Sequence, residues 1–386
     1  MMTPFPLTRA TALARLEAFL PDAGAAYARL RNHDRGLGGH VHVSGLSAAL
    51  RRRLISEEEV TRAVLDRHGM KAEKFLSEVL WRTYWKGWLE ARPAVWAGYR
   101  ASLAHWQERL TQDRTLARRH AEAVEARTGI DAFDGWMTEL EETGYLHNWA
   151  RMQFASIWIF TLGLPWELGA DLTLGRFADG DPASNTLSWR WVAGLHTPGK
   201  FYLADAVRIQ DMTGGRFRPK GLATKATLPR DGFMTPDPQA PRSPLRPDPK
   251  APSLLLLTVE DLSLETFPLP PITAIAHLPG ETEADRIALD DALTRARQAF
   301  PLAQVLGPLT RATLKDAPAQ IVTGFAPLGP TADRLEPLRA EAQVTEVLRD
   351  WDARTWPLCR KGFFALKEKM PALFKALEPD LLAHHG

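Results

Sequence analysis

The sequence predicts a mainly α-helical protein in which an all-helical domain is followed by a smaller α/β domain with a parallel sheet. Apolar residues recur at helical spacing through residues 8–225, prolines crowd residues 228–252, and short apolar runs then alternate with helical segments. These observations divide the chain into a helical domain of residues 1–227, a Pro-rich linker of residues 228–252 and an α/β domain of residues 253–386.

The helical domain is predicted from the spacing of its apolar side chains. Leu13, Leu16 and Leu20 repeat at the interval of one helix face. Similar runs predict helices over residues 74–89 and 133–140 and in the segment after Gly144.

The second half of the chain changes from helical periodicity to alternation of strands and helices. The prolines of the linker favour an extended segment over helix or sheet. The run from Ser253 to Val259 has the apolar composition of a buried parallel strand. Further strands are expected at 272–277 and 320–323, and helices at 283–300 and 331–339.

Composition is that of an ordinary globular protein, with 45% apolar and 24% charged residues in 386. Residues 1–250 hold 34 Lys and Arg against 28 Asp and Glu, whereas residues 251–386 hold 14 against 18. A mildly basic first part suits a polyanion partner, and an ordinary mixed-charge surface fits the same numbers equally well.

The single cysteine, Cys359, excludes an internal disulfide and an iron–sulfur cluster, which needs several thiolates. No basic segment followed by an apolar core opens the chain, and no apolar run is long enough to span a bilayer. We therefore expect a cytoplasmic monomer without a membrane partner or a metal.

Four motifs follow one another along the helical domain. They are Val-Ser-Gly-Leu-Ser at 43–47, Phe-Leu-Ser-Glu-Val-Leu-Trp-Arg at 75–82, Thr-Gly-Ile-Asp at 128–131 with Asp134, and the stretch from Thr143 to Trp191. The last contains a His-Asn pair, an Arg-Met pair, an Asp-Gly-Asp loop, a Pro-Ala-Ser-Asn loop and a Trp-x-Trp pair. In this order the motifs resemble the flavin-binding helical domain of the DNA photolyase and cryptochrome family.

Family members begin with an α/β antenna domain, so the domain order is reversed here. Residues 258–264 and the segment from Val347 to Lys369 loosely resemble the first strand and the exit segment of that antenna domain. We expect residues 253–386 to be a relocated, reduced antenna-like domain without a second chromophore. An unrelated small α/β module is the alternative.

The resemblance implies that FAD is the cofactor. Ser44, Leu46 and Ser47 occupy the family's phosphate-binding loop, where hydroxyls and amides would bind the pyrophosphate. The alternative for Ser44 is a helix cap and for Ser47 a turn residue. Val43 lacks the hydroxyl of the family's usual threonine.

Four further residues match positions around the flavin ring. Arg151 and Asp179 match a pair that lies against the isoalloxazine, and Arg151 would stabilise negative charge on the reduced ring. Asp181 matches a second carboxylate, and Asn185 matches the residue that faces N5, where an amide both donates and accepts. A purely structural Arg151–Asp179 ion pair is the alternative.

Three tryptophans match the family's electron relay from the surface to the flavin: Trp189, Trp166 and Trp106. Indole suits this role because it is easily oxidised and packs closely against neighbours. Trp106 matches only across a gap of several residues. Core packing is the alternative, and it is the better interpretation for Trp136 and Trp158.

The resemblance also implies a pocket for a cyclobutane pyrimidine dimer flipped out of the DNA stack. Glu78 matches the carboxyl that hydrogen-bonds the dimer, and Trp81 and Trp191 match its aromatic walls. Asn148 and Met152 match the remaining contacts, in which the amide bonds a base edge and the thioether adapts to the dimer.

These residues predict a blue-light-driven lyase that repairs pyrimidine dimers in double- or single-stranded UV-damaged DNA by electron transfer from reduced FAD. A cryptochrome-like photoreceptor without repair is the alternative, and repair confined to single-stranded or RNA lesions is a third. Trp149 stands where photolyases usually have arginine. Arg51, Arg52 and Arg53 would either bind DNA phosphates or form a solvated helix face.

Overall fold

The computed structural model describes residues 5–197, 199–229, 235–315 and 317–377. The chain forms two compact units. Unit 1 holds the described residues of 26–43 and 93–237, and unit 2 holds those of 5–25, 44–92 and 238–377.

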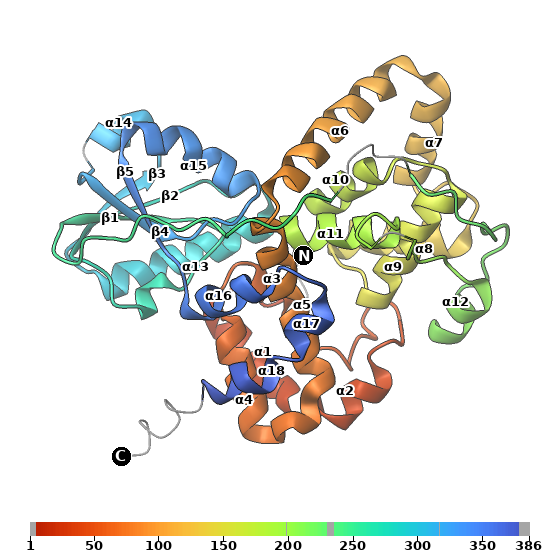
Figure 1. The fold of residues 1–386 in the computed structure, drawn as a ribbon, viewed down its shortest axis with the longest axis horizontal. Helices are drawn as coiled ribbons and strands as arrows, with labels where there is room; N and C mark the ends of the chain where they lie inside the picture. Colours follow the sequence, from red (N-terminus) through yellow and green to blue (C-terminus); the bar gives the residue numbers. More distant parts are fainter. Residues whose placement is uncertain (1–4, 198, 230–234, 316, 378–386) are drawn as a thin grey trace. The chain divides into compact units, whose positions relative to one another are not determined.

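Unit 1 is helical. Asp113 caps α7 by accepting hydrogen bonds from the amides of Thr115 and Leu116, and Gly144 ends α8 in the left-handed conformation at φ 67°. Stacked Phe133 and Phe154 lie in its core, with ring centroids 4.4 Å apart. Its helices, labelled in Figure 1, are most of α2 (Ala25–Leu30), α6 (Pro93–Gln112), α7 (Arg114–Val124), α8 (Asp131–Thr143), α9 (Asn148–Ser156) with a π-helical turn (Ile157–Thr161), α10 (Trp166–Arg176), α11 (Pro182–Val192) and α12 (Ala206–Met212).

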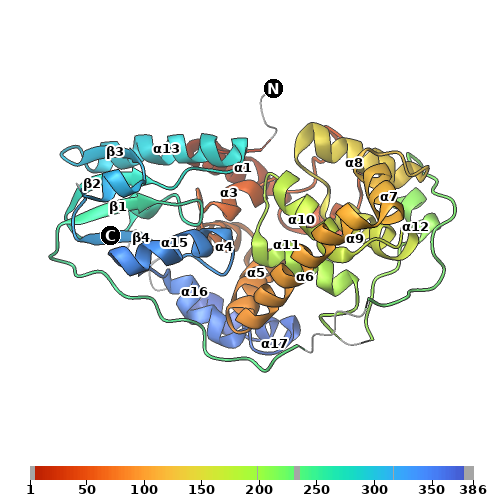
Figure 2. The same ribbon diagram turned by 90° about the horizontal axis from the view of Figure 1, so that it is seen from above.

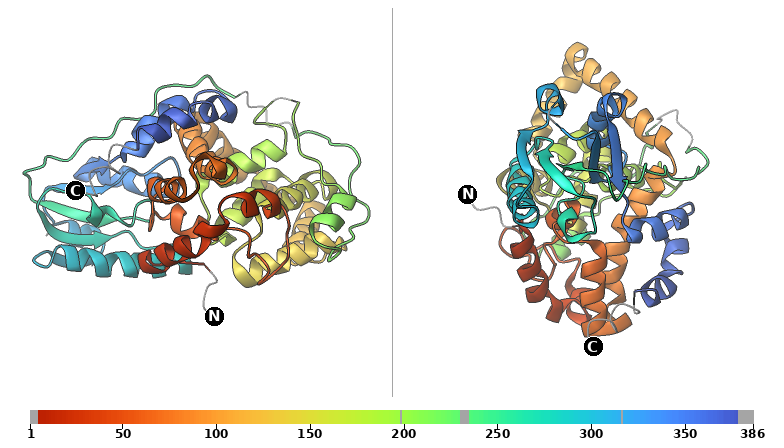
Figure 3. Two further views of the ribbon diagram at one scale, coloured as in Figure 1. Left: turned by 90° about the horizontal axis from the view of Figure 1, so that it is seen from below. Right: turned by 90° about the vertical axis from the view of Figure 1, so that its left-hand side faces the viewer.

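Unit 2 combines helices from both ends of the chain with the sheet. Its helices are α1 (Arg9–Phe19), α3 (Ser47–Arg51), α4 (Glu57–His68), α5 (Glu73–Glu90), α13 (Glu283–Ala299), α14 (Arg311–Lys315), α15 (Pro330–Glu341), α16 (Asp350–Thr355), α17 (Phe363–Lys367) and α18 (Met370–Lys375). Short 3₁₀ turns lie at Leu20–Asp22, Gly69–Ala72, Leu264–Thr266 and Trp356–Leu358. Figure 3 shows α16 and α17 beside α5, where the indole N–H of Trp351 donates to Thr83 Oγ1 at 2.9 Å.

The sheet of unit 2 has five parallel strands in the order β3-β2-β1-β4-β5. The strands are β1 (Ser253–Leu257), β2 (Ile272–His277), β3 (Gln304–Pro308), β4 (Gln320–Gly324) and β5 (Gln343–Val347). Helices α13 and α15 cover opposite faces (Figure 2), so the central strands β1 and β4 are fully buried. The predicted combination of a helical domain with a parallel α/β domain is confirmed.

From β1 the chain adds β2 and β3 on one side of the sheet, and β4 and β5 then follow on the other side of β1. Both βαβ halves start from the middle of the sheet, and ligands of such sheets bind at the carboxyl ends of these two strands. The loops that matter for a ligand are therefore those after Leu257 and after Gly324.

The compact units do not follow the predicted division of the chain. Residues 5–25 and 44–92 group with the sheet rather than with the remaining helices, because α5 packs against α16, α17 and the turn at Trp356–Leu358. The linker residues 235–248 contain no helix or strand. The boundary at 228–252 stays a prediction, since compactness alone does not define folding domains.

Among the described residues, no helix combines the length and the apolar character that crossing a bilayer requires.

Candidate functional site

An ion pair links α9 to the loop before α11. Arg151 Nη2 lies 3.0 Å from Asp179 Oδ1, so the structure brings the predicted pair together. The guanidinium also lies 3.9 Å from the ring centroid of Phe177, and its Nε donates to the carbonyl of Leu146 at 2.9 Å. The Arg151 side chain keeps 25% of its surface exposed, so part of the cation remains available to an anionic ligand.

Asp181 and Asn185 hold the start of α11. Asp181 caps the helix by accepting from the amide of Ser184 at 2.8 Å, and Pro182 occupies the first turn. The Asn185 amide donates to the carbonyl of Ala170 at 2.7 Å, and its oxygen accepts from Thr173 Oγ1 at 2.9 Å. These two bonds fix the amide orientation and use one of its two N–H donors.

Asn148 and Met152 lie one turn apart on α9 and therefore share a helix face. Asn148 is exposed and Met152 half-buried. Before them, His147 caps the helix, with Nδ1 accepting from the amide of Trp149 at 3.3 Å. Burial lowers the pKa of His147 to about 4, so this ring is neutral at pH 7.

Trp149 is directed into the core of unit 1. It is 2% exposed and makes an edge contact with Trp136 at 6.4 Å. The tryptophan at this position therefore has a packing role. Trp191 is half-buried beside Tyr202, with centroids 5.8 Å apart.

Within unit 2, the predicted phosphate loop is ordered by a residue that the sequence analysis did not select. Arg15 of α1 donates through Nε to the carbonyl of Ser44 at 2.6 Å. Gly45 has a φ of 66°, Ser44 Oγ accepts from the amide of Leu46 at 3.3 Å, and Ser47 opens α3. A half-buried cation therefore lies beside the backbone of this loop, at the Ser44 carbonyl. The sequence feature that could have identified Arg15 is its position next to the apolar residues that form the buried face of α1.

Glu78 and Trp81 lie one turn apart on α5, and both are half-buried. The Trp81 ring stacks on Phe363 of α17, with centroids 3.7 Å apart and planes 8° apart. Phe363 was not selected from the sequence, because the pairing joins residues far apart in the chain. One face of the predicted aromatic wall is thus covered by a phenyl ring.

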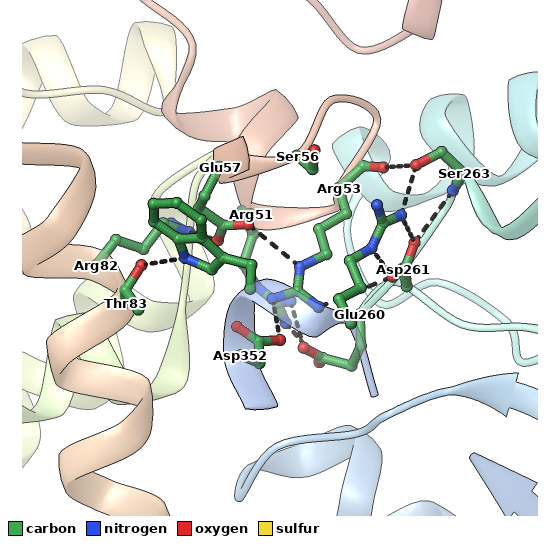
Figure 4. Close-up of polar contacts among 12 residues, drawn as sticks. Arg51, Arg53, Ser56, Glu57, Arg82, Thr83, Glu260, Asp261, Ser263 and Asp352 are labelled. Atoms are coloured by element: carbon green, nitrogen blue, oxygen red, sulfur yellow. Dashed lines mark hydrogen bonds and ion pairs between the residues drawn. The ribbon is translucent and has the colours of Figure 1, made fainter. Parts of the chain in front are cut away.

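The predictions for Arg51, Arg52 and Arg53 are both wrong, because the three side chains are 6%, 2% and 1% exposed. Arg51 binds Glu260 through two hydrogen bonds of 2.8 and 2.9 Å, and Arg52 binds Asp285 (Figure 4 shows the Arg51 and Arg53 contacts). These carboxylates belong to the α/β part of unit 2, so the cations are neutralised inside the protein.

Arg53 lies at the centre of a buried charge cluster formed with Glu57, Asp261 and Asp352. Arg53 Nη2 donates to Asp352 at 2.5 Å, and its other nitrogens lie 3.4 Å from Glu57 and 3.8 Å from Asp261. Burial alone lowers the pKa of Arg53, but the three carboxylates raise it above its ordinary value. The backbone of Arg53 is left-handed, at φ 47°, which is strained for a side chain other than glycine.

A group of possible metal ligands lies in unit 1. Ligand atoms of Asp34, His40 and Glu139 fall within 4.8 Å of one another. Arg216 donates to Asp34 at 2.6 Å and to Glu139 at 3.2 Å, and His40 bonds Glu139. Since the arginine already neutralises both carboxylates, the group is an ion-pair cluster.

Comparison with known proteins gives a match over the central helices. A model described as the FAD binding domain of DNA photolyase matches residues 75–214. A deoxyribodipyrimidine photo-lyase of Thermus thermophilus is 33% identical over 224 residues, which are 56% of this chain and 50% of that protein. One of Streptomyces griseus is 30% identical over 194 residues, 50% of this chain and 38% of that protein.

Among solved structures, a bacterial class III photolyase of Agrobacterium tumefaciens aligns with a TM-score of 0.45 and 24% identity, over 54% of this chain and 43% of that one. The chain spans half or less of the length of the curated relatives described above.

Proposed function

This chain belongs to the DNA photolyase and cryptochrome family, and on that premise we propose that it binds FAD and repairs cyclobutane pyrimidine dimers in DNA under blue light. The observation that carries the proposal is the Arg151–Asp179 ion pair, together with the fixed amide of Asn185, both within the matched segment. Both the cation and the amide keep capacity to bind an additional group.

The residues present fit the flavin. Arg151 would place positive charge where reduction adds negative charge to the ring, which stabilises the reduced form. Asn185 would direct its remaining N–H to the ring, while Thr173 and Ala170 hold the amide in place. Bound FAD in its reduced form would supply the electron that splits the dimer.

The phosphate loop supports the same cofactor. Ser44 and Ser47 would donate hydroxyl hydrogen bonds to a pyrophosphate. Leu46, which is buried, lies between these two serines in the loop. Arg15, which already holds the loop through Ser44, would add positive charge near the phosphates. A dianionic ligand therefore suits this loop better than a neutral one.

Glu78, Trp81, Asn148, Met152 and Trp191 would form the contacts to the dimer. Glu78 would hydrogen-bond the lesion and the two indoles would pack on its bases. Asn148 is exposed and Met152 half-buried on one face of α9, which supports a role in contacting a ligand.

A cryptochrome-like photoreceptor is the second candidate function. The stacking of Phe363 on Trp81 favours it, because a base cannot pack on a face that a phenyl ring already covers. In that case FAD and the tryptophans are retained while the lesion is not bound.

The sheet is the place where a second chromophore would bind, at the carboxyl ends of β1 and β4. There Glu260 is held by Arg51 and by the Thr331 hydroxyl, and Asp261 accepts two hydrogen bonds of 2.6 Å from Arg349. Because both carboxylates are already bound by side chains of the protein, we expect no second chromophore at this edge of the sheet and FAD as the single chromophore. The absorption spectrum of the purified protein tests this expectation.

The test of repair uses the FAD-loaded, reduced protein with UV-irradiated oligonucleotides, single- and double-stranded, in blue light and in the dark. Mass spectrometry quantifies cyclobutane dimers and other lesions. Light-dependent loss of dimers, abolished in Glu78→Gln, supports repair. Unchanged dimers with a flavin that still undergoes photoreduction would refute repair and leave the photoreceptor.

A further inference from the structure

Tyr202 connects two helices of unit 1, α9 and α11. Its ring lies 5.8 Å from the ring of Trp191 on α11, measured between centroids, and the two planes are 35° apart. Its hydroxyl accepts a hydrogen bond of 2.5 Å from the side-chain amide of Gln153 on α9. One half-buried side chain therefore reaches from the predicted aromatic wall of the lesion pocket into the core of the unit.

The main chain around Tyr202 is bound to the same two helices. The amide of Tyr202 donates to the carbonyl of Val192 at 3.1 Å, at the end of α11. The amide of Ala204 donates to Ser156 Oγ at 2.8 Å, at the end of α9. Since Gln153 and Ser156 are three positions apart on α9, one face of that helix binds this segment twice. Both the backbone and the hydroxyl of Tyr202 are therefore fixed.

Gln153 is a polar residue in the core of unit 1. It is 0% exposed, and its amide oxygen has no hydrogen-bond partner among the described residues. If the amide is turned over, Tyr202 donates to that oxygen and the amide nitrogen is left without a partner instead. A buried polar atom without a partner destabilises the folded state, whereas an apolar side chain such as leucine has no such atom. The bond to Tyr202 is therefore the contact that a glutamine provides here and an apolar residue does not.

The two tryptophans at the end of α11 are held in different ways. Trp189 is buried, and its Nε1 donates to Thr173 Oγ1 at 2.9 Å, which fixes the indole. Trp191 is half-buried and has no corresponding hydrogen bond within the described part of the chain. The aromatic ring that contacts it there is that of Tyr202. The position of the Trp191 ring therefore depends on the position of Tyr202.

We propose that Tyr202 is a positioning residue that fixes the Trp191 indole relative to α9 and thereby sets the affinity for the dimer. This inference rests on the proposed function, in which Trp191 packs on the lesion. Helix α9 carries Asn148 and Met152, the other predicted contacts to the dimer in unit 1. Because Tyr202 joins this helix to Trp191 through Gln153, it determines how far the indole lies from those contacts. Without the link the indole can turn away, which weakens binding of the dimer and leaves binding of undamaged DNA unchanged.

Two single variants and their combination test the link. Tyr202→Phe keeps the ring and removes the hydroxyl, and Gln153→Leu removes the amide. Fluorescence anisotropy of the FAD-loaded, reduced protein in the dark measures its affinity for a labelled oligonucleotide with one cyclobutane dimer and for the undamaged oligonucleotide. Each single variant should bind the dimer several-fold more weakly and undamaged DNA as the parent does. The double variant should match the single variants, because all three lack the same hydrogen bond.

Urea unfolding of the same variants separates positioning from a purely structural role. Tyr202→Phe leaves the whole Gln153 amide buried without a partner and should be less stable than the parent. The double variant removes that amide, so it should regain stability without regaining affinity for the dimer. Tyr99→Phe is the matched control, because the Tyr99 hydroxyl of unit 1 is buried and also has no partner among the described residues. That control should equal the parent in dimer affinity and should not be less stable.

Tyr202→Phe with the dimer affinity of the parent would overturn the inference. Recovery of affinity together with stability in the double variant would overturn it too, because the bond would then serve folding alone. Additive losses of affinity would show that the two residues act through separate contacts and would have the same consequence. A parent protein that binds dimer-containing and undamaged DNA equally would instead refute the proposed repair, and with it the inference that rests on it.

Discussion

Replacing Arg53 by glycine tests whether the buried charge cluster stabilises unit 2. The variant removes the contacts to Asp352 at 2.5 Å and to Glu57 at 3.4 Å and leaves both carboxylates buried without this partner. Removing one member of a buried ion pair costs about 3–5 kcal/mol. Glycine also relieves the left-handed backbone at φ 47°, which returns about 1 kcal/mol.

We therefore expect Arg53→Gly to lower the free energy of unfolding by about 2–4 kcal/mol at pH 7. Urea unfolding followed by circular dichroism measures this change. Ala126→Gly is the matched control for strain, because Ala126 also has a left-handed backbone, at φ 54°, and carries no charge. That variant should be stabilised by up to about 1 kcal/mol.

A second variant separates the ion pair from other effects of the substitution. Adding Asp352→Asn to Arg53→Gly replaces the stranded carboxylate by a neutral amide, so part of the lost stability should return. An Arg53→Gly protein as stable as the parent, with Ala126→Gly stabilised as expected, would refute the reasoning, because the ion pairs would then contribute no more than the strain.

Three other variants test single contacts. Burial raises the pKa of Glu90 to about 7, so the stability that its protonated carboxyl contributes is complete below pH 4.5 and is lost as the pH rises through 7. In urea unfolding, Glu90→Gln should therefore equal the parent protein near pH 4.5 and be more stable than the parent by up to about 3 kcal/mol above pH 7. Equal stabilities of the two proteins at both pH values would contradict this expectation. Phe363→Ala should uncover Trp81 and tighten binding of dimer-containing oligonucleotide in a fluorescence titration, whereas Phe364→Ala, at an exposed position, should leave the affinity unchanged. Arg151→Lys keeps the charge but loses the planar fork, so the purified protein should hold less FAD by absorbance, and full occupancy would rule out a ring contact.

The helices and central strands were predictable because their signals are local. The apolar spacing of residues 74–89 corresponds to α5, and the apolar run from Ser253 corresponds to β1. Strand β3 was missed because Gln304–Pro308 is a short edge strand with a glycine and a proline and with little burial. Its pairing with β2 is a tertiary property that the segment alone does not show.

One contact of the predicted site, the ion pair between Arg151 and Asp179, is present in the structure, while the roles of the site residues stay predictions. Arg151 and Asp179 are 28 residues apart in the sequence and meet as the motif implied. Arg51, Arg52 and Arg53 looked like surface residues, because three consecutive cations are usually solvated. The carboxylates that hydrogen-bond them lie more than 200 residues later, so the sequence around the three arginines does not show that they are buried. The role of Phe363 was not predicted either, because its partner Trp81 is far from it in the sequence.

The distance between these partners along the chain has a consequence for biosynthesis. The Arg53–Asp352 contact spans 299 residues and the Arg51–Glu260 contact spans 209. On the ribosome, α3, α4 and α5 emerge long before the carboxylates that neutralise them, so unit 2 cannot complete its core until α16 has left the exit tunnel. During that interval the early helices expose apolar and cationic surface, and nascent chains truncated before Asp352 should be more sensitive to protease and more strongly bound by chaperones than the full chain.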